Sequence, residues 1–180
     1  MASVARAGRV GVANRGSLRQ KVARGGQAGR PRLTLHNENR TDMAIPSFFP
    51  VTTHRDARGS LGVMEGDDLP FDVRRVYYLF DVPIGAVRGE HGHKTLEQLM
   101  ICMHGRVEVT LNDASGQFHF VLDSPAIALH IPPGLWRSLR FVDPDTVVCV
   151  LASQPYDRQD YIYTFEEFLT WVASKDIAAR

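Results

Sequence analysis

The stretch Arg88-Gly89-Glu90-His91-Gly92-His93-Lys94 carries the strongest structural signal in this chain of 180 residues. If these residues form a strand, side chains two positions apart point to the same side, so the imidazoles of His91 and His93 lie next to each other. A lone histidine on a strand is usually structural or solvated, whereas a pair on one face is a candidate site. The segment therefore predicts two titratable bases side by side.

The residues around the pair follow a recognisable spacing. The order is Gly85, five residues, His91-x-His93, four residues, Gln98, six residues and Gly105. This pattern resembles the first motif of the cupins, except that Gln98 stands where that motif has a metal-binding glutamate. Glu97 could supply a carboxylate one position earlier, but the interval to Gly105 favours Gln98 as the counterpart.

The second cupin-like motif, Pro132-Pro133-Gly134-Leu135-Trp136-Arg137, places Arg137 where a metal cupin has its last ligand, a histidine. A guanidinium cannot be deprotonated in a protein and cannot bind a cation. With Gln98 and Arg137 in place of two ligands, we expect no metal and no cofactor. The histidine pair is then free for proton chemistry, because a neutral imidazole can act as a base in one step and as an acid in the next.

Short strand-forming segments separated by turn residues run through most of the chain. Arg106 to Leu111, for example, alternates apolar and polar side chains as a half-buried strand does. Only Phe165 to Val172 has helical spacing, with Thr164 as N-cap and Glu167 completing a capping box. Many short strands and one terminal helix predict an all-β cupin jelly roll, or double-stranded β-helix, whose interior can hold a small ligand.

The first 42 residues differ in composition from the rest. Met1 to Asn37 contains eight arginines and lysines and no acidic residue, and it lacks the hydrophobic periodicity that would bury a core. We expect residues 1–42 to be a disordered basic extension and residues 43–180 to be the single folded domain. A targeting segment, or a start codon placed upstream of Met43, would account for the same composition.

The remaining composition excludes several classes of function. The formal net charge of +1 gives no global reason to expect a nucleic acid or a membrane surface as partner, and no apolar run is long enough to span a bilayer. Cys102 and Cys149 lie in apolar strand-like runs without C-x-x-C spacing, which is typical of buried thiols in a reducing compartment. We expect a soluble cytoplasmic protein.

Several side chains near the histidine pair could bind a ligand. Arg75 and Arg88 could bind phosphate oxygens, because the planar guanidinium suits them, although they could equally be solvated charges at strand edges. Tyr77, Trp136 and Tyr161 could offer stacking faces or hydroxyls to a base or a sugar, although aromatic residues on strands are more often part of the core.

The chain as a whole resembles the sugar-nucleotide 3,4-ketoisomerases, metal-independent cupins that act on dTDP-4-keto-6-deoxyhexoses. The resemblance runs from Phe49 to Phe168. Two positions depart from the family's usual sequence: Gly92 replaces an alanine between the histidines, and Tyr163 replaces an arginine after Asp160-Tyr161-Ile162. The matching blocks are Arg58-Gly59-Ser60-Leu61, Leu69-Pro70-Phe71, Arg75-Val76-Tyr77-Tyr78-Leu79-Phe80-Asp81, the histidine segment, Leu96-Glu97-Gln98, Ile131-Pro132-Pro133, Val150-Leu151-Ala152-Ser153 and Asp160-Tyr161-Ile162.

This resemblance implies a tautomerisation that moves a ketone between C4 and C3 of the hexose, in deoxysugar or deoxyaminosugar biosynthesis. By analogy, His91 removes the C3 proton to give an enediol and the proton returns to C4, while His93 orients its partner or shuttles protons. Tyr77, Arg88 and Gln98 are the candidates that stabilise the developing oxyanion. Arg75 is the candidate that binds the diphosphate of the dTDP-linked substrate.

Three alternatives remain open at this point. A 3- or 3,5-epimerase on the same substrate also removes a proton beside the ketone, but returns it to the same carbon. A metal-dependent cupin oxygenase or isomerase would need a bound ion, and a non-catalytic sugar-nucleotide-binding cupin would show no turnover. We also expect a homodimer, because pairing of two copies would cover exposed sheet edges.

Overall fold

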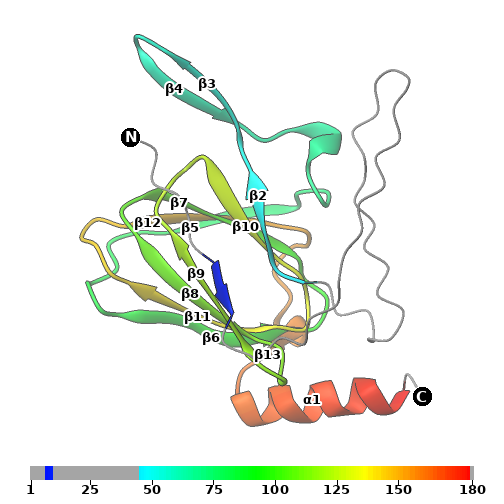
Figure 1. The fold of residues 1–180 in the computed structure, drawn as a ribbon. Helices are drawn as coiled ribbons and strands as arrows, with labels where there is room; N and C mark the ends of the chain where they lie inside the picture. Colours follow the sequence, from blue (N-terminus) through cyan, green and yellow to red (C-terminus); the bar gives the residue numbers. More distant parts are fainter. Residues whose placement is uncertain (1–6, 10–44, 179–180) are drawn as a thin grey trace, which may run out of the picture.

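The computed structural model describes residues 7–9 and 45–178. Two antiparallel sheets face each other, and a helix follows the last strand (Figure 1). The strands are β1 (Ala7–Arg9), β2 (Ser47–Pro50), β3 (Thr52–Asp56), β4 (Gly59–Val63), β5 (Arg75–Leu79), β6 (Val87–His93), β7 (Gln98–His104), β8 (Val107–Asn112), β9 (Gln117–Leu122), β10 (Ile127–Ile131), β11 (Trp136–Phe141), β12 (Val147–Ala152) and β13 (Tyr161–Ile162), and the helix is α1 (Phe165–Ala178).

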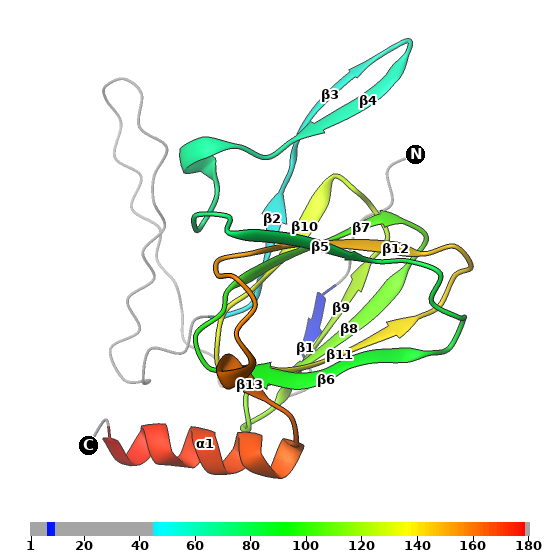
Figure 2. The same cartoon turned by 180° about the vertical axis from the view of Figure 1, so that it is seen from behind.

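The strand order places segments that are distant in sequence side by side. One sheet has the order β1-β9-β8-β11-β6-β13, the other has the order β2-β10-β7-β12-β5, and β3 and β4 form a separate hairpin. Both views show this hairpin projecting away from the sheets, at the end opposite α1 (Figures 1 and 2). The arrangement confirms the expected all-β double-sheet fold with one C-terminal helix.

Apolar side chains from the inner faces of the two sheets form the main core. Strands β7, β8, β10, β11 and β12 supply most of it, because every second side chain of each strand points inward. Val107, Leu111, Leu129, Phe141 and Val150 are each fully buried. This core fixes the positions of the polar side chains that point into the same interior from β5, β6 and β11.

The capping box predicted for the helix is present. The backbone amide of Glu167 donates to Oγ1 of Thr164 at 3.1 Å, and the backbone amide of Thr164 donates to Oε2 of Glu167 at 3.3 Å. Phe168 is fully buried against β6 and β13. A Cβ at Gly92 would lie 3.3 Å from Cδ2 of Phe168, so the glycine between the histidines gives the helix room to pack closely.

The structure describes one short piece of the N-terminal segment that was predicted to be a disordered extension. Ala7–Arg9 pairs with Phe118, His119 and Phe120 of β9 as strand β1. Pairing of this kind uses backbone groups at an open sheet edge, so it needs no hydrophobic pattern and leaves no signal in the sequence. The rest of the predicted extension, residues 1–6 and 10–42, lies outside the described residues.

No helix in the described part of the chain is both long and apolar enough to cross a membrane.

Candidate active site

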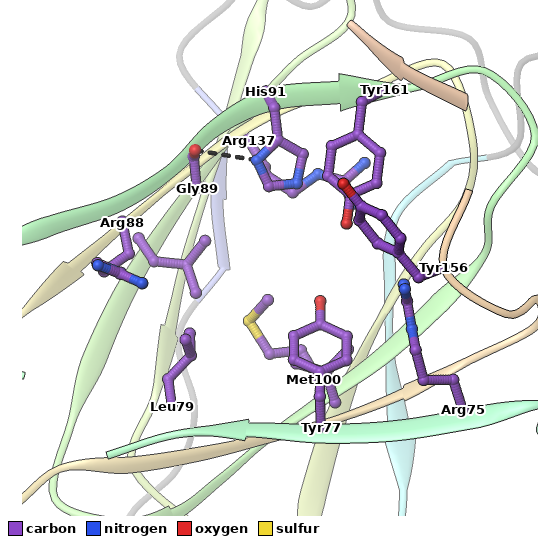
Figure 3. Close-up of a pocket in the computed structure, with 12 residues that line it drawn as sticks. Arg75, Tyr77, Leu79, Arg88, Gly89, His91, Met100, Arg137, Tyr156 and Tyr161 are labelled. Atoms are coloured by element: carbon purple, nitrogen blue, oxygen red, sulfur yellow. Dashed lines mark hydrogen bonds between the residues drawn. The ribbon is translucent and has the colours of Figure 1, made fainter. Parts of the chain in front are cut away.

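A cavity of about 530 Å³ opens between the two sheets (Figure 3). Strands β5, β6, β7, β11 and β12 line it, together with Tyr156 and Tyr161 from the segment that leads to α1. One part of the wall is apolar and the other carries cations, aromatic rings and one imidazole. The lining residues are Arg75, Tyr77, Leu79, Arg88, Gly89, His91, Met100, Arg137, Leu139, Val150, Tyr156 and Tyr161.

A β-bulge in β6 sets the position of the histidine pair. The register against β11 shifts between Arg137, which pairs with His91, and Ser138, which pairs with Gly89, so that Glu90 is left unpaired with φ of 53°. Gly89 has φ of 89°, and a Cβ there would lie 3.1 Å from the carbonyl oxygen of Arg137. The positive φ and the close carbonyl oxygen together require glycine at this position, two residues before His91.

His91 presents a bare nitrogen to the cavity. Its Nδ1 lies 2.9 Å from the carbonyl oxygen of Gly89, which can only accept, so Nδ1 carries the proton and donates it (Figure 3). Burial, and then the charge of Arg137, lower the pKa of His91 to about 4, against the opposing effect of the Gly89 carbonyl. The side chain is therefore neutral at pH 7, with Nε2 free to accept a proton.

His93 occupies a different environment from its neighbour. It is 1% exposed, does not line the cavity, and its ring packs edge-on against His91 at a centroid distance of 4.9 Å. Burial and the charge of Arg137 hold the pKa of His93 far below its ordinary value, so it is neutral. Both expected catalytic histidines are thus adjacent, but only His91 reaches the cavity.

Asp160 fixes the orientation of His93. Its Oδ2 lies 2.8 Å from Nδ1 of His93, while its Oδ1 accepts from the backbone amide of Thr95 at 2.7 Å and from the Thr95 hydroxyl at 2.8 Å. A carboxylate with these partners keeps the proton of His93 on Nδ1. This role for Asp160 was not predicted from the sequence, although the residue belongs to a block that matches the ketoisomerases.

Two buried side chains and a partly buried tyrosine form a hydrogen-bonded chain in the interior. Arg137, 2% exposed, donates from Nη1 to Oε1 of Gln98, and Gln98 donates from Nε2 to the hydroxyl of Tyr77 at 2.7 Å. Burial lowers the pKa of Arg137 to about 10, which leaves it a cation at pH 7. Burial raises the pKa of Tyr77, so its hydroxyl keeps its proton.

This chain of hydrogen bonds shows what Gln98 and Arg137 do in place of the two metal ligands of a cupin. Gln98 and Arg137, which stand at two ligand positions of a metal cupin, bind each other, and the guanidinium places a permanent positive charge beside His91 and His93. These residues do not fit a divalent cation, because an amide and a cation replace a carboxylate and an imidazole. The arrangement instead suits an anion that develops on a bound ligand.

The structure brings most of the predicted binding residues to the cavity. Arg75, Tyr77, Arg88 and Tyr161 line it, and Gln98 contacts it through Tyr77. Figure 3 shows His91 and Tyr77 on opposite walls, with Arg75 and Arg88 toward opposite ends.

Trp136, the remaining residue predicted to bind substrate, does not line this cavity. Its ring packs against Phe165 and Phe168 of α1, at centroid distances of 5.5 and 6.1 Å. Side chains alternate along β11, so with Arg137 directed into the interior its neighbour must face the other side. The same alternation could have identified Arg137 itself as a cavity residue, a role that the sequence analysis did not assign.

Comparisons with known proteins agree with this geometry. Residues 43–173 match the family model described as FdtA: WxcM-like, C-terminal. Over 119 residues the chain is 40% identical to the TDP-4-oxo-6-deoxy-alpha-D-glucose-3,4-oxoisomerase of Aneurinibacillus thermoaerophilus, an alignment that covers 66% of this chain and 86% of that protein.

Two solved structures extend the comparison. QdtA, a sugar 3,4-ketoisomerase from Thermoanaerobacterium thermosaccharolyticum solved in complex with TDP, superposes with a TM-score of 0.70 at 33% identity, covering 72% of this chain and 96% of that chain. The rmlC epimerase of Mycobacterium tuberculosis superposes with a TM-score of 0.59 at 19% identity, covering 72% and 75% of the two chains. The second likeness concerns the fold alone.

Proposed function

We propose that this chain, which belongs to the family described as FdtA: WxcM-like, C-terminal, is a TDP-sugar 3,4-ketoisomerase. Its substrate in this proposal is a TDP-4-keto-6-deoxyhexose. The observation that carries the proposal is the pairing of one neutral, bare imidazole nitrogen on His91 with a buried cation and a phenol around one cavity. A proton beside a ketone is removed readily only when the developing oxyanion is stabilised. The cavity wall offers both functions, and the relatives named above carry out this type of isomerisation.

In the proposed first step, Nε2 of His91 removes the proton from C3. The C3–H electron pair forms the C3–C4 double bond, and the C4 carbonyl oxygen takes the negative charge. The cation of Arg137 and the hydroxyl of Tyr77 stabilise that charge. Tyr77 can donate because its oxygen already accepts from Gln98, which leaves its own proton free to point elsewhere.

In the second step, the proton of the C3 hydroxyl passes to the C4 oxyanion, which becomes the C4 hydroxyl. The C3–O bond becomes the ketone, and the electron pair of the C3–C4 double bond takes up the proton that the imidazolium of His91 returns to C4. The sum of the steps moves two hydrogens and no oxygen, so the protein needs no oxidant or reductant. Of the two roles that the resemblance implies for His93, orienting its partner or shuttling protons, we assign the first: His93 is a positioning residue that fixes the ring of His91, because it does not line the cavity.

Product analysis in deuterium oxide tests this function. The substrate to use is TDP-4-keto-6-deoxyglucose, which is bound in the structure of a QdtA variant. That variant is 32% identical to this chain and superposes with a TM-score of 0.70, covering 72% of this chain and 95% of that chain. Proton NMR should show the ketone at C3 and deuterium at C4. A product that keeps the C4 ketone but has an inverted C3 or C5 would establish the epimerase alternative instead.

We also propose that the protein is a homodimer that works in the cytoplasm. Strand β5 ends its sheet among the described strands, and Val76 and Tyr78 on this strand and Phe80 just after it are exposed. The projecting β3–β4 hairpin exposes Leu61. A two-fold axis would let each copy cover the other's open edge with one set of contacts. Light scattering after size exclusion should give twice the chain mass, and a monomer at micromolar concentration would contradict the proposal.

A further inference from the structure

Tyr163 is the departure from the ketoisomerase pattern that the proposed reaction leaves unexplained. It follows β13 directly and is 51% exposed. Its ring stacks on that of Tyr161, with centroids 5.5 Å apart and planes at 15°. Tyr161 in turn packs against His91 and His93, at 5.0 and 4.3 Å. Tyr163 therefore extends a row of rings from the histidine pair toward solvent.

Tyr156 adds a third ring at the mouth of the cavity. It lies in the segment after β12, is 62% exposed, and its ring is 5.5 Å from that of Tyr161 at an angle of 53°. Burial, and then interaction with the Tyr156 side chain, raise the pKa of Tyr163, so the two phenols lie close together. An exposed ring on a connecting segment ordinarily changes rotamer freely, so these two contacts hold Tyr156 in one orientation.

Arg75 connects this group of rings to the reacting end of the cavity. Its guanidinium lies 5.2 Å from the centre of the Tyr77 ring and 5.8 Å from that of Tyr156. Its Nε is buried and has no hydrogen-bond partner among the described residues. Figure 3 shows Arg75 and Tyr156 at the same end of the cavity, with Arg88 at the other end.

The order of these groups matches the order of groups in a nucleotide sugar. With the keto sugar between His91 and Tyr77, the diphosphate reaches Arg75, whose side chain lines the cavity and whose guanidinium suits phosphate oxygens. The next group along the ligand is the nucleoside, and the next groups along the protein are the rings of Tyr156 and Tyr163. Flat bases bind well to aromatic faces, because every base has a π-face.

We infer that Tyr156 provides the stacking face for the nucleobase and that Tyr163, through its ring and hydroxyl, is the positioning residue that holds Tyr156 in place. This inference rests on the proposed function for the location of the sugar. Tyr163 stands where the usual ketoisomerase sequence has an arginine. It thus supports the base through ring contacts and supplies no charge to the phosphates.

Calorimetric binding of TDP and of inorganic pyrophosphate, each without turnover, tests the inference. Tyr156→Ala should weaken TDP binding by about 5- to 100-fold, the range for loss of one base–aromatic stack. Tyr163→Phe, which keeps the ring and removes the hydroxyl contact, should weaken it by about 2- to 10-fold. Pyrophosphate binding should stay within about twofold in both variants, because only the base contacts change. Tyr78→Phe, which removes the hydroxyl of an exposed tyrosine on β5, is the matched control and should change neither affinity.

A Tyr163→Arg variant gives the converse result. It should tighten pyrophosphate binding and weaken the preference for TDP, because a cation replaces the ring that supports Tyr156. Equal losses for both ligands in Tyr163→Phe, or unchanged TDP affinity, would overturn the inference. The parent protein could bind TDP more tightly than pyrophosphate, lose that preference in Tyr156→Ala, and yet turn over no keto sugar. That result would refute the proposed function and leave this inference standing.

Discussion

Arg137→Gln separates the charge of the buried guanidinium from its hydrogen bond. In the parent, Arg137 donates to Gln98 and lowers the pKa of the neighbouring His91. Glutamine can still donate to Gln98 but carries no charge. The substitution should therefore act on the reaction in two ways, through the protonation of His91 and through stabilisation of the oxyanion.

The effect on protonation has a ceiling that the structure sets. The ordinary pKa of His91 is 6.5, and in the folded protein it is about 4, with burial as the larger cause and Arg137 as the second. Burial persists in the variant, so the pKa should rise from about 4 without reaching 6.5. At pH 5 the neutral fraction of His91 then falls by at most about 30-fold. Loss of the oxyanion's cation should separately lower the rate at every pH, by about 100- to 1,000-fold.

The assay is the pH profile of kcat/KM, which reports the pKa of the free enzyme's base. Initial rates of TDP-4-keto-6-deoxyglucose isomerisation should be followed by NMR from pH 4 to pH 9, with circular dichroism at each pH to verify folding. The parent should lose activity only near pH 4, and the variant at a higher pH. Arg140→Gln, at an exposed position on the same strand, is the matched control and should reproduce the parent profile.

Two results would refute this reasoning. A parent profile that falls near pH 6.5 would show that His91 is not held neutral by its surroundings. A normalised Arg137→Gln profile that superposes on the parent profile would show that the guanidinium does not act on the catalytic base.

Four other perturbations have defined outcomes. His91→Asn should lower kcat by about 100- to 10,000-fold while TDP affinity in calorimetry changes little, since only the base is lost; retained turnover would assign the base elsewhere. Asp160→Ala should lower the free energy of unfolding in urea by about 1–3 kcal/mol, because it leaves the buried Nδ1 donor of His93 without a partner and removes the acceptor of the Thr95 amide, and an unchanged midpoint would contradict the buried network. Phe168→Ala should cost about 3–5 kcal/mol in the same assay by opening a cavity under α1, whereas Leu169→Ala, partly exposed on the same helix, should cost much less. Acid should destabilise the parent as the pH falls from 6.5 toward 4, because unfolded His91 then binds a proton that folded His91 does not; a midpoint that is constant over this range would argue against a buried neutral imidazole.

Local patterns were sufficient to predict much of this molecule. Two-residue alternation placed His91 and His93 on one face, and the Thr164–Glu167 capping box marked the start of α1. Both depend on side chains a few positions apart, whose relative directions are set by the backbone geometry of a strand or a helix. The replacement of two metal ligands by Gln98 and Arg137 could likewise be recognised from spacing and from the chemistry of the two groups.

The tertiary structure alone decided which of these residues share the cavity. The two histidines look equivalent in the sequence, but they occupy different environments in the structure. His91, next to the bulge at Glu90, lines the cavity, whereas His93 is held in the interior by the carboxylate of Asp160, 67 positions further along the chain. Trp136 and Arg137 are neighbours in sequence, but packing of α1 on one side of β11 sends the ring outward and leaves the guanidinium inside. Exposure, tautomer and pKa depend on long-range contacts, and those exist only once the two sheets have packed together.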